Sequence, residues 1–267
     1  MSIKRTILIA ATFLAGFGSV KAQSSASKNS LGELNTVSTA VPFLMIAPDS
    51  RAGAMGDAGA ASAPDPNGIH WNMAKMAFLE KGAGFAVSYT PWLSRVASDI
   101  NLAYLSLYSK GSDMQTFALS LRYFSLGGIT FRDESGNSLG DFNPNELAVD
   151  LGYARKLSKQ FSLGMAFRYI RSDLTSGQVV GGLQSKPGTS VAGDVGMYFE
   201  SEEFKIDMYD AFYSAGLNIS NVGAKISYTE SGEENFLPTN LRLGQALKFN
   251  FDKYNTLTFM LDASKLL

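Results

Sequence analysis

The sequence lacks cysteine altogether, and its 267 residues include one histidine and two tryptophans. Without cysteine the chain can form no disulfide, offers no thiolate ligand and cannot be acylated as a lipoprotein. His70 stands alone, so no histidine pair can bind a metal ion, and a structural role for it is preferred over that of a catalytic base. We therefore expect no cofactor, no metal site and no enzymatic activity.

An excess of charge of one sign is also missing. The 23 basic and 24 acidic residues give a net charge of −1, which leaves no electrostatic footprint for nucleic acid. One acidic group fits a solvated turn better than a cation site, and its members are Glu200, Glu202, Glu203, Asp207 and Asp210. Past the N-terminus, no stretch approaches the roughly 18 consecutive apolar residues of a membrane helix. If the protein lies in a membrane, it crosses as strands.

The N-terminus has the features of an export signal. Lys4 and Arg5 precede an apolar run from Thr6 to Val20, and a small-residue cleavage pattern ends at Ala22. This arrangement predicts a signal peptide over 1–22 that is removed from the mature chain. A Ser-rich, mobile leader is expected over 23–41.

Large apolar side chains alternate with small or polar ones along much of the remaining chain. Over 161–169, phenylalanine, leucine, methionine and tyrosine interleave with serine, glycine, alanine and arginine, and 117–123, 147–153, 195–199 and 241–249 behave alike. Alternate residues of a strand share a face, so one face here meets an apolar medium while the other accepts charge. The pattern predicts a transmembrane β-barrel, and a soluble sandwich shares the same periodicity.

The connections separate these two alternatives. We predict strands at 83–92, 99–109, 114–126, 146–157, 160–173, 190–200, 210–220, 239–250 and 254–264. The connections at 110–113, 158–159, 201–209 and 251–253 are short, whereas those at 127–146, 174–189 and 221–238 are long and polar. Such sorting is typical of outer-membrane barrels, with turns in the periplasm and loops outside. The predicted fold class is all-β, a transmembrane antiparallel outer-membrane β-barrel.

Residues 42–80 show no strand alternation and are rich in alanine and glycine. Gly53, Gly56 and Gly59 are expected to permit close approach of this segment to an inner wall. Asn72 is predicted to cap a short helix that follows a turn at 65–68. We expect the segment to fold inside the barrel lumen as a hatch.

The hatch residues carry a resemblance. Residues 48–59, followed by the His-Trp-Asn of 70–72, resemble the N-terminal signature of the PorV family, outer-membrane proteins of the type IX secretion system of Bacteroidetes that are similar to FadL-like barrels. The matching hatch positions are Asp49, Arg51, Gly53, Gly56, Asp57, Gly59, Trp71 and Asn72. Met73 replaces the usual proline at little expected cost, because methionine is a good helix former.

The resemblance implies a barrel of about 14 strands when complete. The strand count predicted here is nine, which is odd, and a periplasmic N-terminus would then leave the C-terminus outside. Residues 264–267 also lack the aromatic end of a closing strand. We therefore expect 81–267 to be an incomplete barrel from a truncated chain.

The resemblance also implies a secretion role in the outer membrane without catalysis. PorV-type proteins bind the C-terminal signal domains of secreted cargo, hand the cargo to a surface sortase and associate with the outer-membrane translocon. The cargo-binding surface would be formed by the loops 127–146, 174–189 and 221–238. Phe131, Phe142 and Phe236 are the expected aromatic anchors within these loops.

The alternative function is a FadL-like channel for hydrophobic compounds, which would need a continuous apolar pocket. The inward parity is instead rich in Gly, Ala, Ser and charge, which weakens this alternative. The inward charged residues are expected to pair with one another and with the hatch, and they are Arg122, Asp150, Arg168, Asp194 and Arg242.

The outward parity is expected to face lipid. Leu119, Leu151, Met165 and Leu243 should lie near mid-membrane, whereas a charge at the inward Ser120 or Gly164 should be tolerated unless it meets the hatch. An aromatic belt near the strand ends is expected from Tyr89, Trp92, Tyr104, Tyr108, Tyr123, Tyr153 and Tyr169.

Overall fold

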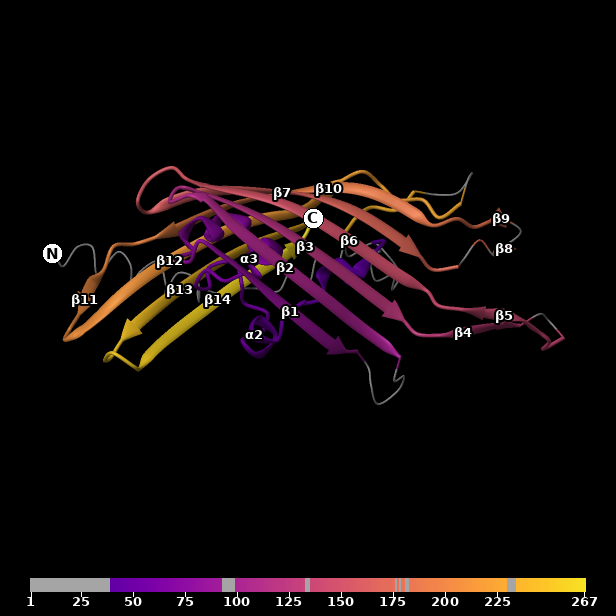
Figure 1. Cartoon of the computed structure of the whole chain (residues 1–267), viewed down its shortest axis with the longest axis horizontal. Coiled ribbons are helices and arrows are strands. Elements are labelled where there is room, and N and C mark those ends of the chain that lie inside the picture. The colour runs from indigo at the N-terminus through magenta and orange to yellow at the C-terminus, as the bar shows by residue number, and fades with distance from the viewer. Residues whose placement is uncertain are drawn as a thin grey trace, which may run out of the picture.

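The structure, a computed structural model, describes residues 39–92, 99–132, 135–175, 177, 179–180, 183–229 and 234–267. The expected signal peptide and nearly all of the expected leader lie outside these residues. The described chain is mostly β, and most of its strands belong to one large antiparallel sheet (Figure 1).

Across the described residues, the main path of this sheet has nine strands in the order β1-β2-β3-β6-β7-β10-β12-β13-β14. Their bounds are Ala83–Pro91, Ile100–Ser112, Gln115–Leu126, Asn145–Lys156, Phe161–Asp173, Gly188–Glu200, Tyr209–Gly223, Asn240–Asn250 and Thr256–Leu266. Short β11 (Phe204–Ile206) pairs with the start of β12. The sheet is not closed into a barrel.

The alternation of side chains explains why these segments form strands with two unlike faces. In β7, Met165 and Phe167 are 60% and 53% exposed, whereas Ala166 and Arg168 between and beside them are buried. The other predicted outward residues, Leu119, Leu151 and Leu243, are exposed as well. One face of the sheet therefore presents large apolar side chains, and the buried face carries small residues and charge.

All nine predicted strands are confirmed, with boundaries within a few residues of the prediction. The long connections contain two separate hairpins, β4 (Ile129–Arg132) with β5 (Ser138–Phe142) and β8 (Val179–Val180) with β9 (Leu183–Gln184). Both project from the same end of the sheet, on the right of Figure 1. We call this the loop end, and the opposite end, with its tight connections at 113–114, 157–160 and 251–255, the turn end.

The hatch segment, residues 42–80, packs against the buried face beneath the arched sheet (Figure 1). It contains η1 (Pro42–Met45), α2 (Ser50–Ala54), α3 (Gly68–Trp71) and η2 (Met73–Phe78). The predicted cap is confirmed, because the Asn72 side chain accepts a hydrogen bond from the backbone N–H of Ala74. None of the helices in the described ranges has both the length and the apolar character needed to cross a membrane.

The hatch segment runs from the loop end to the turn end. Its start packs against Leu102 and Phe124, which lie at the loop end of β2 and β3. Near its end, the carbonyl of Leu79 accepts a hydrogen bond from Lys110 Nζ at 3.0 Å, at the turn end of β2. The described chain thus enters the interior from the loop end, opposite to the periplasmic start assumed in counting the strands.

Two tyrosines of the expected aromatic belt lie on the other face. Tyr104 and Tyr108 are 2% and 7% exposed. They belong to the inward parity of β2, where Tyr104 pairs in register with Arg122 of β3. The belt prediction is therefore wrong for these two residues, because proximity to a strand end does not fix the face on which a side chain lies.

Candidate functional site

A row of inward glycines leaves room for the hatch segment. Gly164 and Gly196 lie opposite each other on β7 and β10, and Gly216 and Gly244 do so on β12 and β13. A Cβ at Gly164 would lie 2.3 Å from the backbone nitrogen of Ala74. The hatch backbone thus approaches the sheet as closely as only glycine permits. The alternation predicted these glycines to be inward but did not identify their hatch partners.

Asn72 joins the hatch segment to the sheet and is completely buried. Its Nδ2 donates to the carbonyls of Met197 at 2.9 Å and Ala60 at 3.1 Å, and its Oδ1 accepts from Ala74 at 3.1 Å. A Cβ at Gly196 would lie 2.2 Å from Asn72 Oδ1. Both amide hydrogens have acceptors, so this buried polar side chain is satisfied and fixes where η2 begins.

Side chains of β12 and β14 bind the backbone of the hatch. Ser214 Oγ donates to the carbonyl of Ala61 at 2.8 Å. Asp262 Oδ2 accepts from the backbone N–H groups of Gly59 and Ala60 at 2.8 and 2.9 Å. These bonds satisfy backbone groups that the irregular segment leaves without helix or sheet partners.

Trp71 lies among three other predicted hatch and lumen residues, Asp49, Asp57 and Arg242. Its Nε1 donates to Asp49 Oδ2 at 2.8 Å, while Asp49 Oδ1 accepts from the N–H of Ala52 at 2.8 Å and so caps α2. The guanidinium of Arg242 lies 4.6 Å from the indole and donates to the carbonyl of Asp57 at 2.7 Å. Arg242 therefore contacts the hatch, as predicted.

The three hatch glycines do not make the predicted close approach to the inner wall. A Cβ at Gly59 would lie 2.2 Å from the indole of Trp71, which belongs to the hatch itself, whereas Gly53 and Gly56 are exposed and have no atom within 4 Å of a built Cβ. The prediction is therefore wrong for Gly53 and Gly56, and the tight contact of Gly59 lies within the hatch. Gly56 has φ +70°, so its role is conformational. Arg51, also exposed, forms an ion pair with Asp65.

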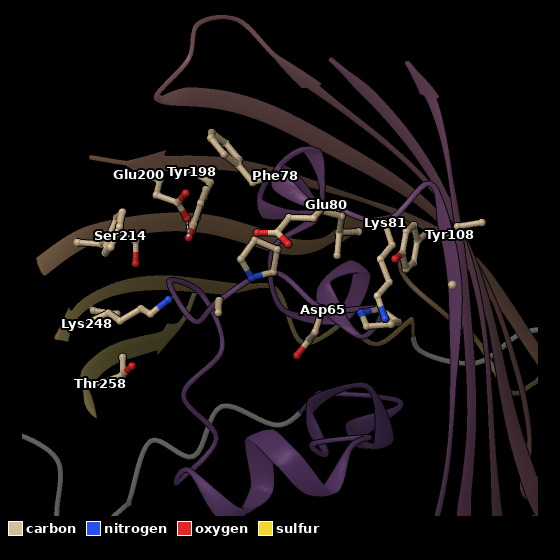
Figure 2. A pocket seen from close by; sticks show the side chains of 18 of the residues that line it. Asp65, Phe78, Glu80, Lys81, Tyr108, Tyr198, Glu200, Ser214, Lys248 and Thr258 are labelled. Atoms are coloured by element: carbon tan, nitrogen blue, oxygen red, sulfur yellow. Dashed lines mark hydrogen bonds between the residues drawn. The ribbon is translucent and has the colours of Figure 1, made fainter. Parts of the chain in front are cut away.

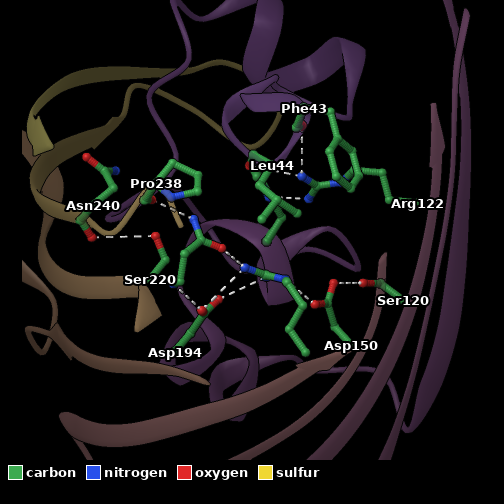
Figure 3. Close-up of polar contacts among 12 residues, drawn as sticks. Phe43, Leu44, Ser120, Arg122, Asp150, Asp194, Ser220, Pro238 and Asn240 are labelled. Atoms are coloured by element: carbon green, nitrogen blue, oxygen red, sulfur yellow. Dashed lines mark hydrogen bonds and ion pairs between the residues drawn. The ribbon is translucent and has the colours of Figure 1, made fainter. Parts of the chain in front are cut away.

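A buried polar network crosses the middle of the sheet (Figure 3). Arg168 Nε donates to Asp150 Oδ1 at 2.5 Å and its Nη2 to Asp194 Oδ2 at 3.0 Å, while Nη1 donates to Asn221. Ser120 donates to the second oxygen of Asp150 at 2.5 Å. Arg168, Asp150 and Asp194 are each at most 4% exposed. The expected mutual pairing of inward charges is confirmed for these three.

Arg122 instead binds the hatch. It is fully buried, and its Nη1 donates to the carbonyl of Leu44 at 2.9 Å and that of Phe43 at 3.4 Å (Figure 3). Its Nη2 lies 2.5 Å from His70 Nδ1. Because a guanidinium only donates, Nδ1 must accept, and His70 is neutral. Burial lowers the pKa of His70 well below its usual value, and the charge of Arg122 lowers this pKa further.

Lys75 is a buried cation that the sequence analysis missed. It is fully buried, and its Nζ donates to the carbonyl of Gly59 at 2.9 Å and to Ser62 Oγ at 2.8 Å. Burial lowers its pKa. The only available signal was a lysine in the middle of an otherwise apolar run. Its contacts tie two distant parts of the hatch together.

The three predicted loop anchors differ in the structure. Phe236 is 64% exposed, with Lys225 Nζ 4.3 Å from its ring centroid. Phe142 is partly buried in β5, and the side chain of Phe131 lies outside the described part of the chain. Phe236 is thus the residue whose exposure matches the prediction.

Two of the long loops are joined to each other. Ser185 and Thr229 form a β-bridge, and the N–H of Lys186 donates to the carbonyl of Tyr228 at 2.8 Å. Tyr228 Oη in turn donates to Ser172 Oγ at 3.0 Å on β7. The loop end therefore presents connected backbone rather than separate strands of coil.

A cavity of about 790 Å³ lies at the turn end between the hatch and the sheet (Figure 2). Tyr198 Oη donates to Glu200 Oε2 at 3.1 Å in its wall. Aromatic and charged side chains share the lining, among them Phe78, Tyr108, Phe212, Glu80, Lys81 and Lys248. The charged groups interrupt the apolar surface, so the cavity lacks the continuous apolar wall that a channel for hydrophobic compounds would need.

Within the described residues, no three His, Asp or Glu side chains gather in a way that could hold a metal ion. The buried face is thus organised to bind the hatch, and the loop end offers exposed backbone and an aromatic side chain.

A family model described as type IX secretion system protein PorV matches residues 29–267. The chain belongs to the PorV family. No curated protein matches the chain. The PorV match covers the hatch segment and every strand of the sheet, so the resemblance seen in the hatch extends over the whole described fold. A PorV-family protein is a component of a secretion system, and that assignment is consistent with a place in the outer membrane.

Proposed function

We propose that this PorV-family protein binds the C-terminal signal domains of secreted cargo at its loop end and passes the cargo from the translocon to the surface sortase. The observation that carries the proposal is the division of the molecule into two ends. Long, interconnected segments gather at one end, above an interior that the hatch segment occupies. The exposed apolar face of the sheet supports a position in the outer membrane, with the loop end toward the outside.

Phe236 is the anchor that the structure supports best, because buried aromatics dominate interface energetics and its side chain is 64% exposed. Phe236→Ser should weaken the binding of a purified signal domain about 10-fold or more and should slow cargo release. Phe131 and Phe142 are secondary anchors, so the triple serine variant should lose more. A matched control is Met208→Ser, since Met208 is 72% exposed at the turn end. Equal effects of the two single changes would argue against the loop end as the binding surface.

The runner-up is a FadL-like channel, which would have to use the charged cavity at the turn end and requires the hatch to move. Asn67 Oδ1 accepts from Ser106 Oγ at 3.1 Å, so their side-chain tips meet between hatch and β2. Because the sequence has no cysteine, Asn67→Cys with Ser106→Cys introduces a single neighbouring pair of thiols, and a short thiol crosslinker that reductant cleaves would hold the hatch. The shuttle predicts normal secretion from the crosslinked variant. Loss of function on crosslinking that reductant restores would favour the channel.

A further inference from the structure

The first residues of the hatch hold a strained backbone. Val41 has φ 47° and ψ 51°, which is the left-handed region, and it is only 1% exposed. A β-branched residue rarely adopts this conformation, and such outliers persist only where the surroundings enforce them. We name residues 40–46 the strap.

One side of the strap is bound to the loop 221–238. The N–H of Ala40 donates to the carbonyl of Phe236 at 3.0 Å. Val41 and Leu44 share a buried apolar cluster with Ile226 and Leu237 of the same loop. The strap therefore lies directly beneath the exposed ring proposed above as the cargo anchor.

The other side of the strap is bound to the sheet and to α3. Arg122 donates to the carbonyls of Phe43 and Leu44, and the same guanidinium donates to His70. Arg122 is completely buried, so losing the two carbonyl acceptors would leave a desolvated cation short of partners. The strap and His70 therefore share one guanidinium as a hydrogen-bond partner.

We propose that the strap is a strained coupling element that transmits the state of the described residues 234–238 of the loop 221–238 to Arg122 and His70. The proposal rests on the proposed function only in naming cargo as what draws the loop away. When the loop moves, Val41 loses the contacts that enforce its conformation and relaxes to extended backbone. The carbonyls of Phe43 and Leu44 then leave Arg122, and the part of the hatch at the loop end loosens. By thermodynamic reciprocity, a tighter strap weakens binding at the loop.

Strain is tested by comparing Val41→Gly with Val41→Ala in the full chain in lipid nanodiscs. Glycine adopts the left-handed region freely, whereas alanine keeps the strain and loses only packing. The readout is hydrogen exchange at the amides of Leu44 and Ile46, which donate to the carbonyls of Val41 and Phe43. We expect exchange several-fold slower in Val41→Gly than in Val41→Ala. Equal or faster exchange in Val41→Gly would overturn the strained strap.

Coupling is tested without cargo, so that its failure is distinct from failure of the proposed function. His70 is the only histidine, and its imidazole therefore gives a single ring signal in a histidine-labelled sample. Leu237→Ala loosens the loop from within and should shift this signal and speed exchange at Leu44. The control Ile129→Ala changes an exposed residue of β4 and should do neither.

An unchanged His70 signal in Leu237→Ala, in protein that is otherwise folded, would overturn the coupling. Addition of a purified signal domain to the wild-type chain should give the same shift. If the domain fails to bind while Leu237→Ala still moves the signal, the coupling stands and the proposed cargo does not.

Discussion

Several residues of the buried face are held by ion pairs, and removal of one partner should destabilise the fold. Arg168 serves two carboxylates and an amide at once, and each of these lies out of water. Replacing a whole buried ion pair by apolar residues is often neutral, but removing one member leaves an uncompensated charge. Loss of one member should therefore destabilise the fold, and the intact network joins β6, β7 and β10 to one another.

Arg168→Met should destabilise the fold by about 3–5 kcal/mol, because Asp150 and Asp194 would stay buried without their cation. The control is Arg171→Met on the same strand. Arg171 pairs with Asp173 at 2.9 Å but its side chain is 39% exposed, so its loss should cost about 0–1 kcal/mol. Urea unfolding in lipid vesicles measures both. Similar losses of unfolding free energy in the two variants would contradict the interpretation that the buried network stabilises the fold more than an exposed ion pair does.

Because His70 is neutral in the folded protein, folding stability should decrease as the pH falls. Its folded pKa is depressed, so between that pKa and about 6.5 the unfolded chain binds a proton that the folded chain does not. The contribution of His70 to stability is thus constant above about pH 6.5 and falls as the pH drops below it. Unfolding of the wild type and of His70→Asn is compared at pH 5 and pH 7. Asparagine can accept from Arg122 without titrating, so the variant should lose less stability on acidification.

At the scale of the element, β7 shows how one strand serves two environments. Its exposed residues Leu163, Met165 and Phe167 are large and apolar, and its buried residues Ser162 and Gly164 touch the hatch. The exception made for contact with the hatch therefore applies to Gly164, and burial makes a charge at Ser120 costly as well. Gly164 abuts the backbone of Ala74, and Ser120 is fully buried against Asp150.

Met165→Arg tests the environment of the exposed face. If lipid covers this face, the substitution should cost about 2–4 kcal/mol of folding free energy in bilayers. Met165 is 60% exposed, so in a protein surrounded by water the same change would be nearly neutral. Lys159→Arg, in the connection before β7, is a control that keeps its charge. A cost below about 0.5 kcal/mol for Met165→Arg would contradict membrane insertion through this face.

The strands could be predicted from sequence because alternation is a local signal that each segment carries by itself. The same alternation also predicted on which face of the sheet most residues lie. What could not be predicted was the partner of each inward position, since contacts such as those of Gly216 with Ala60 join residues far apart in sequence. Lys75 was overlooked for this reason, whereas Tyr104 and Tyr108 were misplaced because proximity to a strand end does not fix the face on which a side chain lies.

At the scale of the whole molecule, the hatch and the sheet are one unit. The hatch has only short helical turns of its own, and such turns are marginal without tertiary contacts. Its position is fixed by bonds to β2, β7, β10, β12 and β14. The sheet in turn carries inward glycines that leave room for the hatch, and Arg122, Arg242 and Asp262 bind the hatch backbone. A hatch held in this way is suited to sealing the interior.

Removing residues 42–80 should therefore open a path and also expose the partners that the hatch satisfies. In planar bilayers, the full-length protein should show little conductance and the deletion variant stable ion conductance, provided that it inserts. Gly164→Leu is a gentler second variant, because its side chain would meet the backbone of Ala74 and push η2 from the sheet. It should give intermittent conductance, whereas Gly53→Leu, at an exposed position with open space around it, should stay closed. If the deletion variant inserts and remains as tight as the wild type, the hatch segment is not the seal, and its many bonds to the sheet would serve stability alone.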